Sequence, residues 1–241
     1  MKTTNLAPPK TKRSRGKIAV AAMLGLIALS AACAPAPAPA PVPVTVPVTV
    51  PASCANGRAS CVLGDIGPGG GKVFYIAGGT RYEMAPNTWS GGVADPQAPW
   101  CSDTTNLVVT SLAIGAGEAN TAAMLTNASP FVACTSGAGY QAPAYRGGGQ
   151  SDWFLPSLFE AGAMCQYSRN PSAPAAGWPC APGSQDATFA SSAYGFSTTA
   201  AYWTSSSTLP LWADAFDFNS GNAALGGKPG SGIAIRPIRS F

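Results

Sequence analysis

The chain has 241 residues, contains no histidine, and carries a formal net charge of +4 from fourteen basic and ten acidic residues. Six of the basic residues precede an apolar segment near the N-terminus, so the chain from Cys54 onward has eight basic against ten acidic residues, a balance near −2. Nucleic acid is therefore not an expected partner. The lack of histidine excludes Ser-His and Cys-His nucleophile pairs and removes the commonest metal ligand.

A basic N-terminal stretch followed by the apolar residues 18–32 has the order of a secretory signal. This run of about fifteen residues is shorter than the roughly 20 that a membrane-spanning helix needs, so cleavage is expected. The segment Leu29-Ser30-Ala31-Ala32-Cys33 resembles a bacterial lipoprotein signal, although Ser30 stands where such signals usually carry leucine.

We predict that residues 1–33 are a signal peptide ending in a lipidated Cys33, which anchors the protein outside the cytoplasmic membrane or at the cell surface. Removing Cys33 from the seven cysteines leaves an even number, as an oxidising compartment favours. The alternative is ordinary cleavage after Ala32 and secretion. The lipid would be the only membrane attachment.

Residues 34–53 form a run of proline interleaved with alanine, valine and threonine. Proline disfavours helices and sheet ladders, so an extended tether is expected. In polyproline II geometry these twenty residues reach roughly 60 Å. The tether either presents the following domain or is a linker without a role of its own.

Residues 54–241 are predicted to form a single extracytoplasmic domain. The glycine-rich turn at 64–71 leads into a β-branched and aromatic run at 72–76 that is typical of a strand. It is not a phosphate-binding loop, because Val73 follows Lys72 where such a loop needs serine or threonine. Residues 115–125 pass from glycines into good helix formers and predict a short helix.

A clearer helix start lies at Ser157, because Glu160 follows at the spacing of a capping box and the next residues supply an apolar face. Strand character returns at 202–206, 212–218 and 233–239. The middle segment alternates apolar and polar residues, as a half-buried strand does.

In this order, these segments resemble the family of the Lcl C-terminal domain, named after the terminal domain of a bacterial collagen-like adhesin. The matching stretches are 64–75, 114–125, 152–160, 202–206 and 235–241. The stretch at 153–157 and the arginine-bearing last strand are also similar to C-type-lectin-like folds, including sulfatase-modifying-factor domains. The resemblance implies an α+β domain with a twisted antiparallel sheet core, one or two short helices and long loops.

The chain departs from these relatives in two ways. It has no Glu-Pro-Asn or Trp-Asn-Asp motif, so calcium-dependent sugar binding is not expected. It also has Leu158-Phe159-Glu160-Ala161 where the family usually has Lys-Asp-Glu-Leu, so only the capping glutamate is shared. The adhesin's association with sulfated glycans is not carried over, because the domain lacks a basic surface.

Six cysteines remain for the domain, and we expect them to form disulfides between sequence neighbours that staple the loops: Cys54 with Cys61, Cys101 with Cys134, and Cys165 with Cys180. A zinc site is the alternative. It is disfavoured because histidine is absent and no two cysteines form a Cys-x-x-Cys pair. No metal or cofactor is predicted.

Carboxylate chemistry of the glycosidase type is the catalytic option that survives. Its candidates are Asp152, Glu160, Asp186, Asp214 and Asp217. Each also has a structural explanation. Glu160 caps a helix and Asp152 suits a turn. The aspartates of segment 212–218 are either charges on opposite faces of a strand or partners for Arg236 and Arg239, which have structural roles. We predict that the protein is not an enzyme.

Tryptophan offers a second route, since its flat apolar face binds sugars or protein partners with little entropy loss. Trp100 and Trp178 lie beside cysteines in predicted loops and are expected to be exposed. Trp212 and Asp214 are further candidates for a ligand surface. The competing explanation is that these tryptophans belong to the core.

The sequence thus predicts a tethered, non-catalytic binding or adhesion module for a glycan or protein ligand. One alternative is a structural envelope lipoprotein without a ligand. A second is a carboxylate-dependent glycan hydrolase.

Overall fold

The computed structural model describes Cys54, residues 60–174 and residues 179–241. All of these belong to one unit of the chain, Pro47–Phe241. The predicted signal segment with Cys33, the predicted tether and Trp178 lie outside the described residues.

One antiparallel sheet has the order β1-β2-β6, formed by Lys72–Ala77, Thr80–Met84 and Ile238–Ser240. Gly78 and Gly79 connect β1 to β2 with φ values of 56° and 87°, as a two-residue hairpin requires. The strand predicted at 72–76 is confirmed. Its partner β2 was not predicted, although two glycines between two strand-like runs are a hairpin signal.

A second antiparallel sheet has the order β3-β4-β5, formed by Tyr202–Trp203, Trp212–Asp217 and Asn222–Gly227. The prediction that residues 212–218 form a half-buried strand is wrong at the strand's centre, where residues 213–216 are all buried. Ala213 and Ala215 pack in one core cluster and Phe216 in another, so both faces of β4 are covered there.

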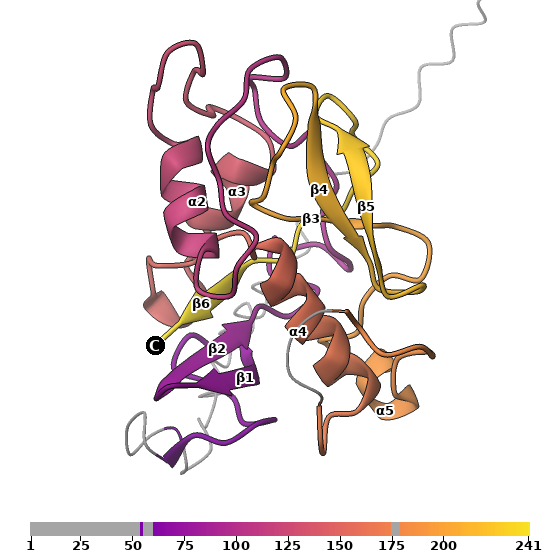
Figure 1. Ribbon diagram of the computed structural model, residues 1–241. Coiled ribbons are helices and arrows are strands. Elements are labelled where there is room, and N and C mark those ends of the chain that lie inside the picture. Colours follow the sequence, from indigo (N-terminus) through magenta and orange to yellow (C-terminus); the bar gives the residue numbers. More distant parts are fainter. Residues whose placement is uncertain (1–53, 55–59, 175–178) are drawn as a thin grey trace, which may run out of the picture. The chain divides into compact units, whose positions relative to one another are not determined.

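The strand expected at 233–239 is interrupted. Only its end enters β6, while Ala234 makes isolated bridges to Tyr202 and Gln97. Pro237 lies between these parts and has no N–H to donate to a ladder. The C-terminal segment therefore joins the two sheets (Figure 1).

Four α-helices occur among the described residues: α2 (Gly117–Met124), α3 (Ala138–Ala144), α4 (Leu158–Arg169) and α5 (Ala187–Ala190), with the 3₁₀ turn η2 (Gly147–Gly149). The predicted helices correspond to α2 and α4. Figure 1 shows α4 lying between the sheets, and it contacts both β1 and β4.

The start of α4 is the predicted capping box. The Ser157 hydroxyl accepts from the Glu160 N–H at 3.3 Å, and the Glu160 carboxylate accepts from the Ser157 N–H at 2.6 Å. Glu160 also accepts from the Gly115 N–H at 2.8 Å, which ties α4 to the segment before α2. Burial raises the pKa of Glu160, against the effect of these hydrogen bonds.

Three disulfides staple the domain in the sequential order expected: Cys54–Cys61, Cys101–Cys134 and Cys165–Cys180. The fold is thus mixed α+β, with two small antiparallel sheets and short helices. The disulfides indicate an oxidising, extracytoplasmic environment. Within the described ranges, no helix is both long and apolar enough to cross a membrane.

The buried arginines do not pair with the aspartates of β4, so that expectation is wrong. Arg236 donates to Asp95 at 2.6 and 2.5 Å. Arg239 pairs with Glu83 at 2.8 Å and with Asp152. For Arg239 the reason is topological, because β6 lies in the other sheet from β4. Arg236 precedes β6, and its guanidinium is held beside Asp95 by the carbonyls of Ala85 and Tyr194. Their structural role stands, since both arginines join distant segments.

Candidate ligand-binding surface

Trp212, Asp214 and Leu225 lie on one face of the β4–β5 hairpin. Asp214 is the register partner of Leu225, and Trp212 is the partner of Gly227. Because side chains alternate along a strand, Trp212 and Asp214 point to the same side of β4. The turn is closed by a hydrogen bond of 2.7 Å from the Gly221 N–H to the Asp217 carbonyl. We call Trp212, Asp214 and Leu225 the Trp212 face.

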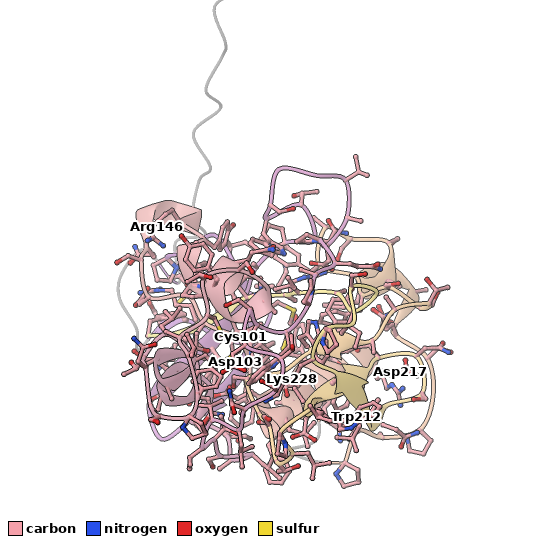
Figure 2. The ribbon with its side chains drawn as sticks, turned by 90° about the horizontal axis from the view of Figure 1, so that it is seen from above. Cys101, Asp103, Arg146, Trp212, Asp217 and Lys228 are labelled. Atoms are coloured by element: carbon pink, nitrogen blue, oxygen red, sulfur yellow. A yellow bond between two sulfur atoms is a disulfide. The ribbon has the colours of Figure 1, made fainter. Side chains whose placement is uncertain are left out.

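The indole of Trp212 lies across the glycine opposite it. A Cβ placed on Gly227 would meet the indole ring at 3.7 Å, an ordinary van der Waals contact, so the ring lies directly beside this position. Trp212 is 46% exposed and Leu225 is 54% exposed. In the turn before β4, Leu209 and Leu211 are exposed as well. This end of the hairpin therefore offers an exposed indole together with exposed aliphatic side chains. Figure 2 labels the position of Trp212.

Asp214 differs from its apolar neighbours because it is a buried carboxylate without a partner. Only 8% of the residue is exposed, and its Oδ2 atom has no hydrogen-bond donor. Burial raises the pKa of Asp214, and burial is the sole cause of that shift. No charged group of the described residues therefore compensates this carboxylate.

The position of Asp214 is fixed by its backbone. Its N–H donates to the Ser206 carbonyl at 2.9 Å, and its carbonyl accepts from the Thr204 N–H at 3.0 Å and hydroxyl at 2.7 Å. At the neighbouring position on the same face, Phe216 packs in the cluster that includes α4 residues. Asp214 therefore stands where the covered part of the sheet face ends and the open part begins.

An unpartnered buried polar group costs about 1–3 kcal/mol, and more when it is charged. Such groups are rare in folded proteins and call for an explanation. The other catalytic candidates are all engaged: Glu160 by the capping box, Asp152 by Arg239, Asp186 by the N–H groups of Thr188 and Phe189, and Asp217 by the Asn219 N–H. Asp217 also lies on the opposite face of β4 from Asp214.

The expectation that Trp100 is exposed is wrong. Trp100 is fully buried in the core cluster that also contains Ala213 and Ala215. Its indole N–H donates to the Thr204 carbonyl at 2.8 Å. The Lys228 ammonium lies 4.7 Å from the centre of its ring. The adjacent Cys101 and its disulfide partner Cys134 are buried in the same cluster.

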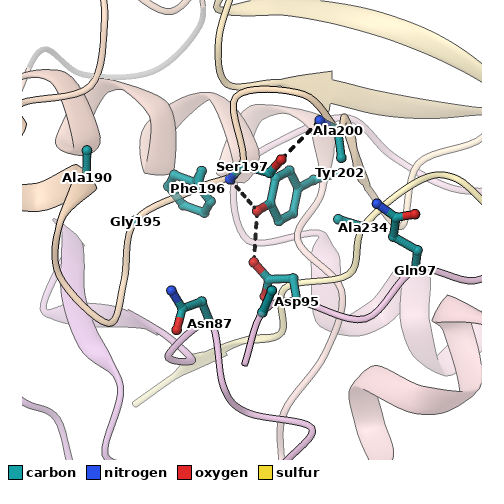
Figure 3. A pocket seen from close by; sticks show the side chains of 11 residues that line it. Asn87, Asp95, Gln97, Ala190, Gly195, Phe196, Ser197, Ala200, Tyr202 and Ala234 are labelled. Carbon is teal, nitrogen blue, oxygen red and sulfur yellow. Dashed lines mark hydrogen bonds between the residues drawn. The ribbon is translucent and has the colours of Figure 1, made fainter. Parts of the chain in front are cut away.

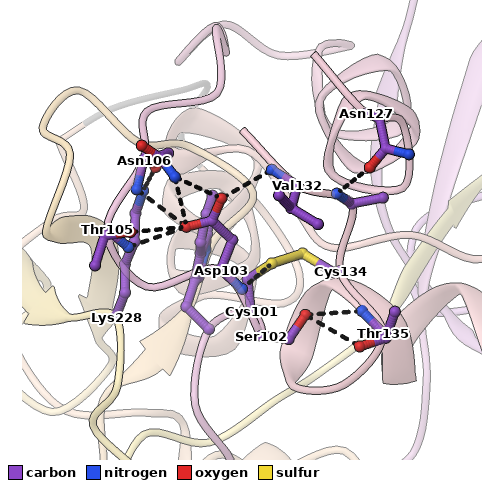
Figure 4. Close-up of a disulfide and its surroundings, with 12 residues drawn as sticks. Cys101, Ser102, Asp103, Thr105, Asn106, Asn127, Val132, Cys134, Thr135 and Lys228 are labelled. Carbon is purple, nitrogen blue, oxygen red and sulfur yellow. Dashed lines mark hydrogen bonds between the residues drawn. A yellow bond between two sulfur atoms is a disulfide. The ribbon is translucent and has the colours of Figure 1, made fainter. Parts of the chain in front are cut away.

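A cavity of about 440 Å³ lies beside the Cys101–Cys134 disulfide, with Asp103 on its wall (Figure 4). Burial raises the pKa of Asp103, but hydrogen bonds from the N–H groups of Val132 and Thr105 outweigh it and hold this pKa well below its usual range. Burial lowers the pKa of Lys228 to about 8, and its ammonium donates to the Asn106 carbonyl at 2.6 Å. These groups satisfy one another and organise the loop.

A second cavity, of about 320 Å³, is lined by Asp95 and Tyr202 (Figure 3). The Tyr202 hydroxyl donates to Asp95 at 2.8 Å, and Asp95 also accepts two hydrogen bonds from Arg236. Burial raises the pKa of Tyr202 above its ordinary value. The polar wall of this cavity is therefore occupied by the protein's own ion pair.

Of the four residues predicted for a ligand surface, the structure places Trp212 and Asp214 on one strand face. Trp100 is buried, and Trp178 lies outside the described residues. Leu225 was missed, although Asn219-Ser220-Gly221 between two strand-like runs predicts a hairpin that would place it on that face. No known family model matches this chain, and no curated protein matches it.

Proposed function

We propose that this protein is an exported, envelope-tethered binding module that holds a glycan on the Trp212 face without chemical conversion. The observation that carries the proposal is the buried, unpartnered Asp214 carboxylate on the same strand face as an exposed indole. A pyranose ring stacks on Trp212 through its apolar C–H face. A hydroxyl of the same sugar donates to the Asp214 carboxylate through the 8% of the residue that remains exposed.

The wider identity belongs to the same proposal. Lipidation at Cys33 and the proline-rich tether would hold the domain at the membrane and present it at a distance of up to roughly 60 Å. The disulfide-stapled α+β fold supports a C-type-lectin-like domain related to the Lcl C-terminal family, and hence an adhesion role. Recognition through Trp212 and Asp214 needs no calcium.

Glycan-array binding of the exported chain tests this function. The chain is produced from residue 34 onward with its three disulfides, and is probed with neutral, amino, acidic and sulfated glycans with and without calcium. We expect a saturable, calcium-independent hit that Trp212→Ala abolishes. Val93→Ala is the matched control, because Val93 is 96% exposed and lies outside the Trp212 face.

The other outcomes separate the alternatives. No saturable binding across the array would favour a structural lipoprotein without a ligand. Binding that survives Trp212→Ala would place the site elsewhere. Release of new reducing ends from a bound glycan, lost in Asp214→Asn, would favour the hydrolase.

A further inference from the structure

The unusual feature of the Trp212 face is its uncompensated charge. The buried carboxylates of Asp95 and Glu83 are each paired with an arginine, and those of Glu160 and Asp103 each accept hydrogen bonds from several backbone N–H groups. Asp214 has no ion pair among the described residues, and no charged neighbour contributes to its pKa shift. A buried negative charge is stabilised most strongly by an opposite charge in contact with it.

A neutral hydroxyl supplies one hydrogen bond but leaves the negative charge uncompensated. An ammonium group supplies both the hydrogen bond and the opposite charge. The neighbouring indole also favours a cation, since the face of a tryptophan ring attracts ammonium groups within roughly 6 Å of its centre.

The spacing on the strand suits a single small ligand unit. Trp212 and Asp214 are two positions apart on β4, which corresponds to about 6.6 Å along a strand. One sugar ring can therefore stack on the indole while a substituent on that ring reaches the carboxylate. Leu209, Leu211 and Leu225 border the site with aliphatic surface and contribute no competing charge.

The remaining electrostatics agree with a cationic ligand. Eight basic and ten acidic residues follow Cys54, which leaves the exported domain near −2. Among the cations that the structure describes, Arg146 is exposed and lies well separated from Trp212 in Figure 2, while Lys72, Arg81 and Arg169 are partly exposed. Arg169 donates to the Asn219 carbonyl in the turn between β4 and β5, at the other end of the hairpin from Trp212. A positively charged saccharide would therefore meet little repulsion at this face.

We propose that the Trp212 face selects an amino sugar with a free ammonium group over its N-acetylated counterpart. This inference rests on the proposed function and names the ligand class for the same site. The sugar ring stacks on Trp212, and its ammonium group forms an ion pair with Asp214. Acetylation removes the charge and adds bulk at the nitrogen, so it weakens binding.

The test compares two probes by titration calorimetry at a pH of about 6, where the amine is protonated. One is a β-1,4-linked glucosamine trimer with free amines, and the other is the fully N-acetylated trimer. The wild-type exported chain is expected to bind the free-amine trimer at least about tenfold more tightly. Added salt should reduce this preference, because it screens the ion pair at the partly open site.

Three variants locate the preference. Asp214→Asn should reduce the ratio of the two affinities to about one while leaving residual binding of both trimers. Trp212→Ala should abolish the binding of both trimers. Asp217→Asn is the matched control, because it removes a carboxylate from the opposite face of the same strand and should keep the ratio.

Failure of the inference is distinguishable from failure of the proposed function. Equal binding of both trimers that Trp212→Ala still abolishes would overturn the amino-sugar selection and leave glycan binding intact. No binding of the free-amine trimer, or a preference that persists in Asp214→Asn, would overturn the inference. A lysine tripeptide that binds as tightly as the trimer would also overturn it, by assigning the face to peptides.

Discussion

Replacing Asp214 by asparagine should stabilise the domain while it weakens ligand binding. The substitution keeps the size of the side chain and removes the charge that burial disfavours. A buried group left without a partner costs about 1–3 kcal/mol. Because asparagine also needs hydrogen bonds, we expect a gain at the low end, about 1 kcal/mol at neutral pH. For a domain of this size that corresponds to a melting temperature higher by about 2–4 °C.

The gain should depend on pH with a definite sign. Burial raises the folded-state pKa of Asp214 above its ordinary value of 3.8. The folded state therefore binds a proton more tightly than the unfolded state, and the wild-type loses stability as pH rises through the raised pKa. Asparagine does not titrate, so its advantage should be present at neutral pH and should shrink as pH falls toward 3.8.

The assay is thermal or urea unfolding of both proteins at several pH values with the disulfides intact. Asp217→Asn is the control on the same strand, because Asp217 accepts a hydrogen bond of 2.8 Å from the Asn219 N–H. It should change stability by less than about 0.5 kcal/mol. If Asp214→Asn destabilises the domain at neutral pH, Asp214 has a stabilising partner and the reasoning about this site is refuted.

Three further predictions concern the scaffold. Replacing both Cys101 and Cys134 by serine should lower the free energy of unfolding by about 2–5 kcal/mol, because their disulfide closes a loop with a sequence separation of 33. An unchanged midpoint of urea unfolding would contradict this prediction. Arg236→Met should lower the free energy of unfolding by about 3–5 kcal/mol, since it leaves Asp95 buried without its cation. If the double variant Arg236→Met with Asp95→Leu recovers much of that stability, the unpaired carboxylate is the cause of the loss. Glu160→Ala should cost about 1–3 kcal/mol, measured by urea unfolding, whereas Glu160→Gln should retain part of the cap.

Features set by local chemistry were predictable from the sequence. The capping box at Ser157 and Glu160 depends on residues three apart and forms as predicted. The strand at 72–76 and the helix around 117–124 likewise follow from nearby residues. The disulfides join sequence neighbours among the cysteines, which is the pairing expected, although six cysteines allow fifteen pairings and the sequence alone does not choose among them.

Features set by distant contacts were not predictable in this way. The residue type of Trp100 suits a loop surface as well as a core, and its burial depends on contacts with segments about a hundred residues away. The partner of Arg239 was misassigned because nothing local shows that β6 joins β1 and β2, and that of Arg236 because Asp95 is 141 residues away in the chain. The half-buried pattern expected for β4 failed because separate core clusters cover its two faces.

The candidate site combines both kinds of information. The residue types of Trp212 and Asp214 determined that they were candidates, because an indole and a carboxylate bind ligands wherever they are accessible. Only the tertiary structure decided that Leu225 lies opposite Asp214, that the indole rests on Gly227, and that the carboxylate is buried without a partner. Burial and partnership depend on which segments fold against β4, and those segments are distant in the sequence.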